Sequence, residues 1–295
     1  MRGKICDAAQ QRILIADGAW GTFLIQKGLR PGQCPELWCI DRPDDVLDVA
    51  RSYVGAGADL IETNTFGGSR LKLDRYGLGH RTAEINEAAA RISRQAAGQD
   101  HWVIGSIGPT GVMLLMEEAT PEELYDVFRE QVQALERGGA DAVCIETMID
   151  IEEAVIAIEA AKQNTSLEVI CTFTFDRTLS GEYRTMMGQD PVTALRRSLQ
   201  AGADIVGSNC GNGLSQMVEI TVIMRAENST VPILIQANAG VPRNIDGLDV
   251  FPETPEEMAA TAKEVVKAGA NILGGCCGTT PAHIVALRNT LLDIS

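Results

Sequence analysis

Short apolar runs alternate with longer stretches of mixed polar and apolar residues along the whole chain. Eight of these runs are almost continuously apolar, which is typical of parallel strands that are buried on both faces. The predicted strands are Ile13–Ala19, Asp59–Thr65, Trp102–Pro109, Ala142–Thr147, Glu168–Phe175, Asp204–Cys210, Pro232–Gly240 and Asn271–Cys277.

The segments between the strands have the apolar periodicity of helices that pack on one face. They are Pro43–Gly55, Ala83–Ala97, Pro121–Arg137, Ile151–Lys162, Pro191–Ala201, Pro255–Ala268 and Pro281–Ile294. Several begin with proline behind an Asp or Thr, which favours a helix start because the first turn needs no N–H from the proline and the polar side chain caps it. This alternation of strands and helices predicts an α/β protein with a parallel sheet.

An internal repeat shows how the strands are grouped. A Gly-Ala-Asp or Gly-Ala-Asn motif recurs in steps of 82, 63 and 67 residues, starting at Gly57, Gly139, Gly202 and Gly269. Each step holds about two βα units, because one unit takes roughly 30–40 residues. No low-complexity linker divides the chain. We therefore predict one (β/α)8 TIM-type barrel over residues 1–295, in which Asp59, Asp141 and Asp204 of the repeat are structural turn residues.

Composition narrows the classes of partner. The chain is 45% hydrophobic and 22% charged, which is typical of a globular protein with a substantial core. Its net charge of −15 disfavours nucleic acid and anionic membrane as partners, since both attract basic patches. The sequence shows neither a signal peptide nor an apolar run of about 18 residues. Eight cysteines without a secretion signal predict reduced thiols and a cytoplasmic location.

Three cysteines stand at the carboxyl ends of predicted strands. Cys210 ends the sixth strand, and Cys276 and Cys277 end the eighth, between Gly274-Gly275 and Gly278. Active sites of such barrels form at this rim. Adjacent cysteines do not easily form a disulfide with each other, whereas both can reach one metal ion. We therefore predict one zinc ion per chain, bound by three thiolates and with a fourth position open.

Such a site favours one kind of chemistry. Three thiolates give zinc a net charge near −1, which makes it a poor Lewis acid for hydrolysis. The ion is suited instead to holding a substrate thiol as a thiolate, and this indicates alkyl transfer to sulfur. Two other interpretations are a vicinal disulfide with a redox role and a non-catalytic binding or scaffold protein with a structural zinc. At the same rim, Asp17 and Glu146 could bind an ammonium group, and the backbone amides around Gly18 and Ala19 a carboxylate.

At this point the chain resembles a known family. The motifs that carry the likeness are Asp17-Gly18-Ala19-Trp20-Gly21-Thr22, Ala58–Phe66, Gly105-Ser106-Ile107-Gly108-Pro109, Asn209-Cys210, Asn238-Ala239-Gly240 and Gly274-Gly275-Cys276-Cys277-Gly278. They resemble the zinc-dependent homocysteine S-methyltransferase family, which includes the homocysteine module of cobalamin-dependent methionine synthase. The likeness extends from residue 17 to residue 278, which is nearly the whole chain.

The resemblance implies roles for the residues at the rim. It implies zinc bound by Cys210, Cys276 and Cys277, with Asn238 near the zinc in the substrate-free state. For homocysteine, it implies that the amino group binds to two carboxylates and the carboxylate group to backbone amides. The residues concerned are Asp17, Glu146, Gly18 and Ala19.

The methyl donor is the point on which members of the family differ. Glu62–Gly67 resembles the methionine-synthase branch, which implies a methylcorrinoid donor. The printed sequence holds no cobalamin-binding region, so we expect a separate protein to carry the corrinoid. The alternative donors are betaine and S-methylmethionine; the betaine branch carries a C-terminal extension that is not in this sequence. Trp20, where the methionine-synthase branch usually has Met, either lines the donor side or caps the barrel mouth.

Overall fold

A barrel of parallel strands forms the centre of the computed structural model, which describes residues 3–245 and 248–292. Within these residues eight strands pair in the order β1-β12-β9-β8-β5-β4-β3-β2, and a bridge between Ala16 and Leu60 joins the two outer strands. The strands are β1 (Leu14–Ile15), β2 (Leu60–Glu62), β3 (Trp102–Ile107), β4 (Ala142–Met148), β5 (Glu168–Phe173), β8 (Ile205–Asn209), β9 (Ile233–Ala237) and β12 (Ile272–Gly275). The predicted (β/α)8 barrel is confirmed.

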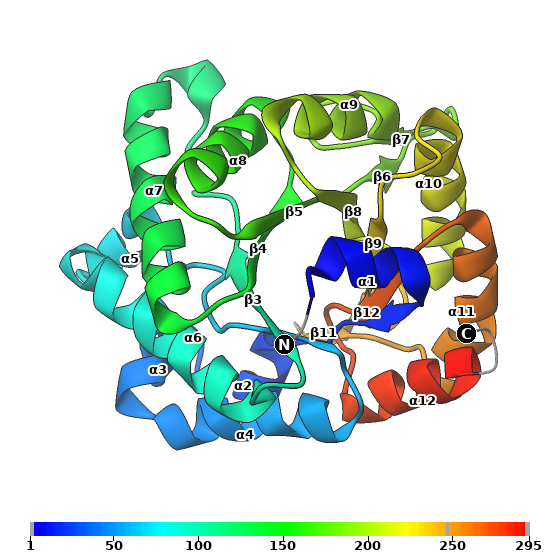
Figure 1. The fold of residues 1–295 in the computed structure, drawn as a ribbon, viewed down its shortest axis with the longest axis horizontal. Coiled ribbons are helices and arrows are strands. Elements are labelled where there is room, and N and C mark those ends of the chain that lie inside the picture. Colours follow the sequence, from blue (N-terminus) through cyan, green and yellow to red (C-terminus); the bar gives the residue numbers. More distant parts are fainter. Residues whose placement is uncertain (1–2, 246–247, 293–295) are drawn as a thin grey trace.

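Each barrel strand is followed along the chain by a helix that covers the outside of the barrel (Figure 1). These helices are α4 (Pro43–Gly55), α6 (Thr82–Ala97), α7 (Pro121–Gly138), α8 (Ile151–Asn164), α9 (Pro191–Ala201), α10 (Leu214–Glu227), α11 (Pro255–Ala268) and α12 (Pro281–Leu291). All the predicted helices are present, three of them with the predicted bounds; the predicted end of the last helix, at residue 294, lies outside the described residues. Helix α10 was not predicted.

The period of two along the strands divides the core into an inner and an outer part. Leu60 and Ile104 point inward and belong to a buried cluster that fills the barrel. Their neighbours Ile61 and Val103 belong to the larger cluster between strands and helices. Successive strand residues face opposite sides, so each strand supplies both clusters in turn.

Helix α1 (Ile5–Gln11) lies across one end of the barrel (Figure 1). Its Ile5 and Ala9 pack into the inner cluster, and the carboxylate of Glu168 accepts hydrogen bonds from the backbone N–H groups of Ile5 at 2.6 Å and Cys6 at 2.9 Å. These contacts close the amino-terminal end of the barrel. Any site inside the barrel must therefore open at the other end.

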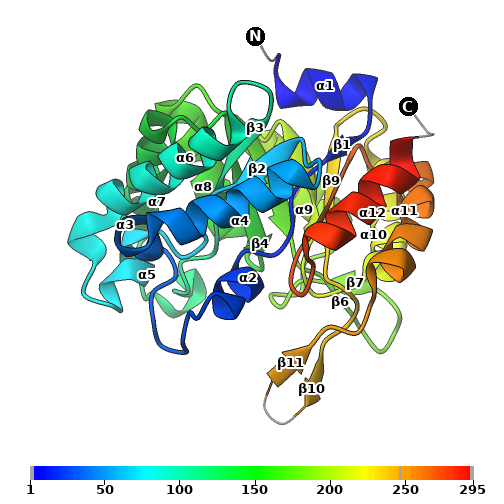
Figure 2. The same ribbon diagram turned by 90° about the horizontal axis from the view of Figure 1, so that it is seen from below.

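The remaining elements of the described chain lie in the loops that follow strands. They are α2 (Gly21–Gln26), α3 (Trp38–Asp41), α5 (Arg70–Asp74), two single 3-10 turns at Gly79–Arg81 and Leu114–Met116, the hairpin of β6 (Asp176–Arg177) with β7 (Tyr183–Arg184), and the hairpin of β10 (Arg243–Ile245) with β11 (Leu248–Val250). Figure 2 shows the β10–β11 hairpin at the end of the molecule opposite α1. The carboxyl-terminal end of the barrel is thus the elaborated one, as in barrel enzymes generally.

The repeated Asp and Asn residues tie neighbouring strands together, as their predicted structural role requires. The side chain of Asp59 accepts a hydrogen bond from the N–H of Ile15 in the adjacent strand at 2.9 Å. The same contact recurs between Asp141 and Val103, Asp204 and Val169, and Asn271 and Ile233. A basic side chain also binds each polar residue: Arg12, Arg94, Lys162 and Arg225. Each copy of the sequence repeat therefore marks a place where the same side-chain contact joins two neighbouring strands.

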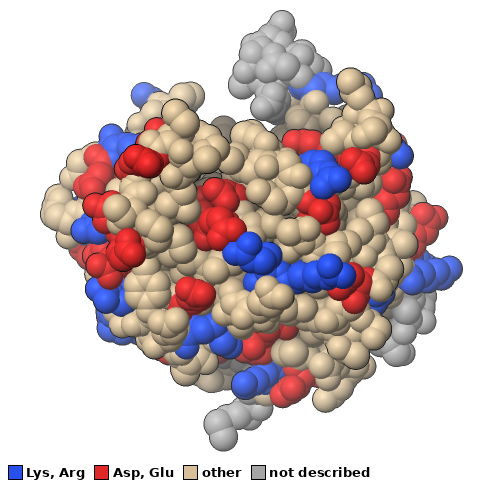
Figure 3. All heavy atoms as spheres, turned by 90° about the horizontal axis from the view of Figure 1, so that it is seen from above, with Lys and Arg blue, Asp and Glu red and all other residues tan. Residues whose placement is uncertain are grey.

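Acidic and basic side chains are interspersed on the helical exterior that Figure 3 shows. Ion pairs join neighbouring helices there, such as Arg196 with Glu227 at 2.6 Å and Arg197 with Glu152 at 2.8 Å. Exposed pairs of this kind each contribute at most about 1 kcal/mol. No helix in the described residues has both the length and the apolar character that crossing a membrane requires.

Candidate active site

Three cysteine side chains meet at the carboxyl-terminal rim. Cys210 directly follows β8, and Cys276 and Cys277 follow β12, which is separated from β8 only by β9. The three sulfur atoms lie within 4.8 Å of one another, and the sulfurs of Cys210 and Cys277 are 3.9 Å apart. The structure thus brings together the three residues that the sequence predicts as metal ligands.

Glycines and an unusual backbone conformation make this approach possible. A Cβ atom on Gly275 would lie 2.2 Å from the hydroxyl oxygen of Thr279, so only glycine fits before the two cysteines. Gly278 has a φ of 79°, which favours glycine, and it turns the chain away behind them. Cys210 itself has a φ of 60°, a conformation that is strained for a residue with a side chain and is found mainly at functional sites.

The thiols share their protons unequally. Hydrogen bonds from the thiols of Cys276 and Cys277 lower the pKa of Cys210 to about 3, and the side chain of Asn238 contributes in the same direction. The hydrogen bond to Cys210 raises the pKa of Cys277 to about 12, and hydrogen bonds to Cys210 and Cys277 raise that of Cys276. The cluster therefore already stabilises one thiolate. A soft cation that replaces the shared protons would stabilise all three.

This donor set fits a zinc ion with one open position. Sulfur ligands at mutual distances below 4.8 Å suit tetrahedral coordination, and among the described residues no further His, Cys, Asp or Glu side chain joins the group. Asn238 follows β9 and is buried, and its Oδ1 atom accepts no hydrogen bond from any described residue. An unpaired buried oxygen of this kind calls for a missing partner.

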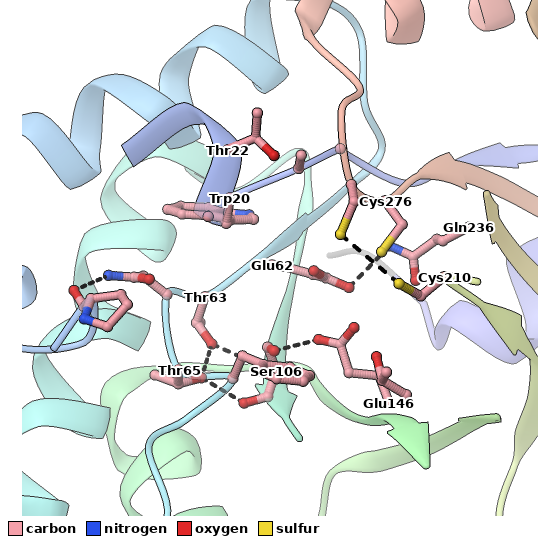
Figure 4. Close-up of a pocket in the computed structure, with 18 of the residues that line it drawn as sticks. Trp20, Thr22, Glu62, Thr63, Thr65, Ser106, Glu146, Cys210, Gln236 and Cys276 are labelled. Carbon is pink, nitrogen blue, oxygen red and sulfur yellow. Dashed lines mark hydrogen bonds between the residues drawn. The ribbon is translucent and has the colours of Figure 1, made fainter. Parts of the chain in front are cut away.

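The cysteines form one wall of a cavity of about 420 Å³. Three carboxylates also line it: Glu36, Glu62 and Glu146. Trp20 forms the side opposite the cysteines in the view of Figure 4. No Lys, Arg or His lies among the residues that line the cavity in the described part of the chain. The cavity is therefore suited to ligands that carry positive charge.

The inward-facing layer above the barrel core is polar. Glu62 and Ser106 come two positions after the core residues Leu60 and Ile104, so they face the barrel interior one layer nearer the rim. Glu146 and Gln236 occupy the same layer on β4 and β9. Both oxygens of Glu146 accept hydrogen bonds, one from the hydroxyl of Ser106 and the other from the amide of Asn209 at 3.2 Å.

Asp17 lies behind the wall of the cavity. It is fully buried, and its Oδ2 atom accepts hydrogen bonds from the indole N–H of Trp20 at 3.0 Å and from the backbone N–H of Glu62 at 2.9 Å. Its Oδ1 atom has no partner among the described residues. Gly18 and Ala19 line the cavity, and the N–H of Ala19 donates to the hydroxyl of Thr279 at 3.1 Å.

The buried carboxyl groups resist ionisation. Burial raises the pKa of Asp17, Glu62 and Glu146, and repulsion from the charge of Glu62 adds to the rise at the other two. For Glu62 the pKa reaches about 7, although a hydrogen bond from Gln236 opposes the shift. Raised carboxyl pKa values in a cavity are typical of functional sites.

Several residues that line or support the site were not among the predicted site residues. They are Glu62, Ser106, Gln236 and Thr279. A signal for the first three was present, because they follow inward core residues by two positions in predicted strands. Thr279 lies in the turn after the cysteines, where its hydroxyl also donates to the carbonyl of Cys276 at 2.8 Å, and no sequence pattern indicates that contact.

Comparisons with known proteins agree with this geometry. The profile of the homocysteine S-methyltransferase family matches residues 14–291. The chain is 29% identical to the methionine synthases of Mycobacterium tuberculosis and Mycobacterium leprae, over 98% and 95% of its length. It spans about a quarter of those longer proteins, since 25% and 24% of their lengths are covered.

Solved structures show the same fold. The metallated form of the homocysteine methyltransferase MmuM from Escherichia coli superposes with a TM-score of 0.79 at 23% identity, covering 97% of this chain and 98% of that one. A methyltransferase from Methanosarcina mazei superposes with a TM-score of 0.62 at 11% identity, covering 98% and 97%.

The fold and the rim together define a (β/α)8 barrel protein in which three convergent cysteines face an acidic cavity. The family match extends over nearly the whole barrel. The chain belongs to the homocysteine S-methyltransferase family.

Proposed function

We propose that this chain transfers a methyl group to the thiolate of homocysteine and so produces methionine. The observation that carries the proposal is the convergence of three cysteine sulfurs, within 4.8 Å of one another, on an acidic cavity that is large enough for an amino acid. Membership of the family supports the same reaction.

Cys210, Cys276 and Cys277 would hold one zinc ion, with Asn238 beside it before substrate binds. Bound there, zinc would keep the acceptor thiol as a thiolate at neutral pH, because a coordinating thiol loses its proton. The protein contributes a fixed arrangement of the three sulfurs, which Gly275 and Gly278 permit.

The amino acid part of the substrate would bind beside the sulfur. In this proposal Asp17 and Glu146 attract the ammonium group, and backbone amides around Gly18 and Ala19 bind the carboxylate. The acidic lining of the cavity supports the first contact. The N–H of Ala19 already donates to Thr279, so it would have to exchange that partner for the substrate.

We propose a methylcorrinoid on a separate protein as the donor. The thiolate would attack the methyl carbon, forming the sulfur–carbon bond while the carbon–cobalt bond breaks and its electron pair returns to cobalt. The motif Glu62–Gly67 and the identity of 29% with two methionine synthases support this choice over betaine or S-methylmethionine. We further propose a cytoplasmic location, since all eight cysteines are free thiols in the structure.

A side-by-side assay of donors tests the proposal. Zinc-loaded protein and homocysteine are incubated with methylcobalamin, betaine or S-methylmethionine, and methionine is quantified. We expect turnover with methylcobalamin and little with the other two. Turnover with only betaine or S-methylmethionine would refute the corrinoid donor but keep the acceptor. Lack of methionine with every donor would argue against the reaction itself.

The metal assignment has its own test. Cys276→Ala removes one of three sulfurs, so we expect zinc bound per chain, measured by mass spectrometry of metals, to fall well below one, and methyl transfer to fall at least about a hundredfold. Cys39→Ala is the control, because it makes the same change at a cysteine that lies outside the cluster. Full zinc and activity in the Cys276 variant would disprove the assignment.

A further inference from the structure

Glu62 is a buried carboxylate of the cavity to which neither the sequence motifs nor the family match assigns a task. It ends β2, faces the barrel interior and lines the cavity. We propose that Glu62 is a further substrate-binding residue and that its carboxylate receives the ammonium group of homocysteine. The inference rests on the proposed function, since it concerns the acceptor of that reaction.

The hydrogen bonds of the three lining carboxylates distinguish Glu62 from the other two. Glu36 accepts from the N–H of Gly67 and from the thiol of Cys34, one bond to each oxygen. Glu146 likewise has a protein donor on each oxygen. Glu62 accepts one bond, from the side-chain amide of Gln236 at 3.0 Å to Oε1, and no described residue donates to its Oε2. Of the three, only Glu62 has an oxygen without any protein donor, while Glu146 could add contacts through the remaining lone pairs of its oxygens.

The neighbours of Glu62 have unused acceptors too. Asp17 binds the backbone N–H of Glu62 through Oδ2, and its Oδ1 is buried without a partner. The Oε1 atom of Gln236 is also buried without a partner. Asp17 after β1, Glu62 at the end of β2 and Gln236 on β9 are linked by these hydrogen bonds, and together they hold three acceptors that lack donors among the described residues. Glu62 and Gln236 line the cavity, so the N–H donors of one ammonium group could pair with the free acceptors of both, while Asp17 lies behind them.

Charge supports the same ligand. No basic side chain of the described residues lines the cavity, so positive charge must come from what binds there. Leaving a charged ammonium group buried without a carboxylate is strongly unfavourable. Burial raises the pKa of Glu62 to about 7, and a bound cation would stabilise its ionised form.

Figure 4 shows how the groups are arranged. Glu62 extends into the space between Trp20 and the cysteines, and Gln236 reaches it from the side of Cys210. A substrate whose sulfur joins the cysteines would then have its amino end within the same small cavity. In this arrangement Glu62 contacts the ammonium group directly, while Asp17 supports it from behind the wall.

The test compares two acceptor thiols on one isosteric variant. Zinc-loaded wild type and Glu62→Gln are titrated calorimetrically with L-homocysteine and with 4-mercaptobutanoate, which has the same thiol and carboxylate but no amino group. We expect Glu62→Gln to weaken homocysteine at least about tenfold, because a buried ammonium loses its counter-charge. Binding of 4-mercaptobutanoate should change by less than about twofold.

Equal weakening of both thiols would overturn the proposal, since Glu62 would then only shape the cavity. Unchanged affinity for homocysteine would overturn it as well and would leave the proposed function intact. If wild-type protein binds neither thiol, the proposed function fails, and this inference fails with it.

Gln236→Leu is a second variant in case Glu62→Gln does not fold. This variant keeps the carboxylate but removes an acceptor of the same cluster. We therefore expect a smaller loss of affinity that again affects homocysteine and not 4-mercaptobutanoate. A loss that is equal for the two thiols would again count against the proposal. Glu36→Gln is the matched control, because both oxygens of Glu36 already have protein donors, and it should not discriminate between the thiols.

Discussion

Trp20 links the wall of the cavity to the buried carboxylate of Asp17. Its indole N–H donates to Asp17, and the residue is 9% exposed and lines the cavity. The structure thus places Trp20 in the wall of the cavity. The hydrogen bond also fixes the orientation of Asp17.

Replacing Trp20 by phenylalanine should therefore reduce stability through one lost hydrogen bond. Trp20→Phe keeps an apolar ring but leaves Asp17 with one donor fewer, and a hydrogen bond to a carboxyl group that resists ionisation contributes about 0.5–1.5 kcal/mol. We expect the free energy of unfolding in urea to fall by about 1 kcal/mol. Trp38→Phe is the control: Trp38 is also buried, and no described residue accepts a hydrogen bond from its indole nitrogen. Equal losses in the two variants would show that the bond to Asp17 is unimportant.

At the scale of single residues, the sequence predicted the location of side chains that directly follow strands better than the location of side chains within strands. Cys210, Cys276 and Cys277 could be brought together because strand ends meet at one rim whatever the exact register. Glu62 and Gln236 required knowledge of which face points inward, and a shift of one residue reverses that face. The partner of Ala19, Thr279, lies 260 positions away in the chain, and only the folded structure reveals it.

Among the elements, helices with a clear start signal were predicted best. Helices α4, α9 and α11 begin at a proline and have the predicted bounds. Helix α10 lacks a start signal, because its N-cap is Gly213, which has no side chain that could cap the helix. It also lacks a clear apolar face, because apolar residues lie on several sides of the helix. Its Ile, Val and Thr residues also favour strands, so the local preference opposed the final structure.

The hairpins and short helices of the rim were not predicted because tertiary contacts, rather than local sequence preferences, stabilise them. The β6–β7 hairpin holds only two residue pairs, Asp176 with Arg184 and Arg177 with Tyr183. Such short elements have little periodicity to detect. The eight predicted strands, in contrast, each overlap an observed strand, because continuous burial on both faces imposes an apolar run. Only β4 extends beyond its predicted bounds, to Met148.

For the whole molecule, the decisive feature is an apolar barrel that ends in a layer of buried carboxyl groups. Barrel geometry turns one residue from each of several strands inward at the same level, and here three of the carboxyls, Asp17, Glu62 and Glu146, are at least 93% buried. The pKa of each is raised. These groups are best tolerated when protonated or when a cation lies beside them, which connects the stability of the fold to pH and to ligands.

The metal-free protein should therefore become less stable as pH rises through the weakly acidic range, because the raised pKa values of three carboxyls outweigh the opposite contribution of Cys210, whose pKa is lowered to about 3. An unfolded glutamic acid has a pKa near 4.5, while that of Glu62 is about 7 in the folded state, so the folded protein binds more protons between these values. The stabilising contribution is complete below about pH 4.5 and is lost as pH rises towards 7. From Glu62 alone it is on the order of 3 kcal/mol.

Urea unfolding at pH 5, 6, 7 and 7.5 with a chelator present measures this dependence. Glu62→Gln should have a flatter dependence than wild type, because glutamine does not titrate, while Asp17 and Glu146 retain their part of the slope. Stability that rises with pH over this range, or a slope unchanged in the variant, would contradict the argument. Adding methionine, which supplies an ammonium group without a free thiol, should restore stability most at the highest pH, since the carboxylates repel one another most strongly there.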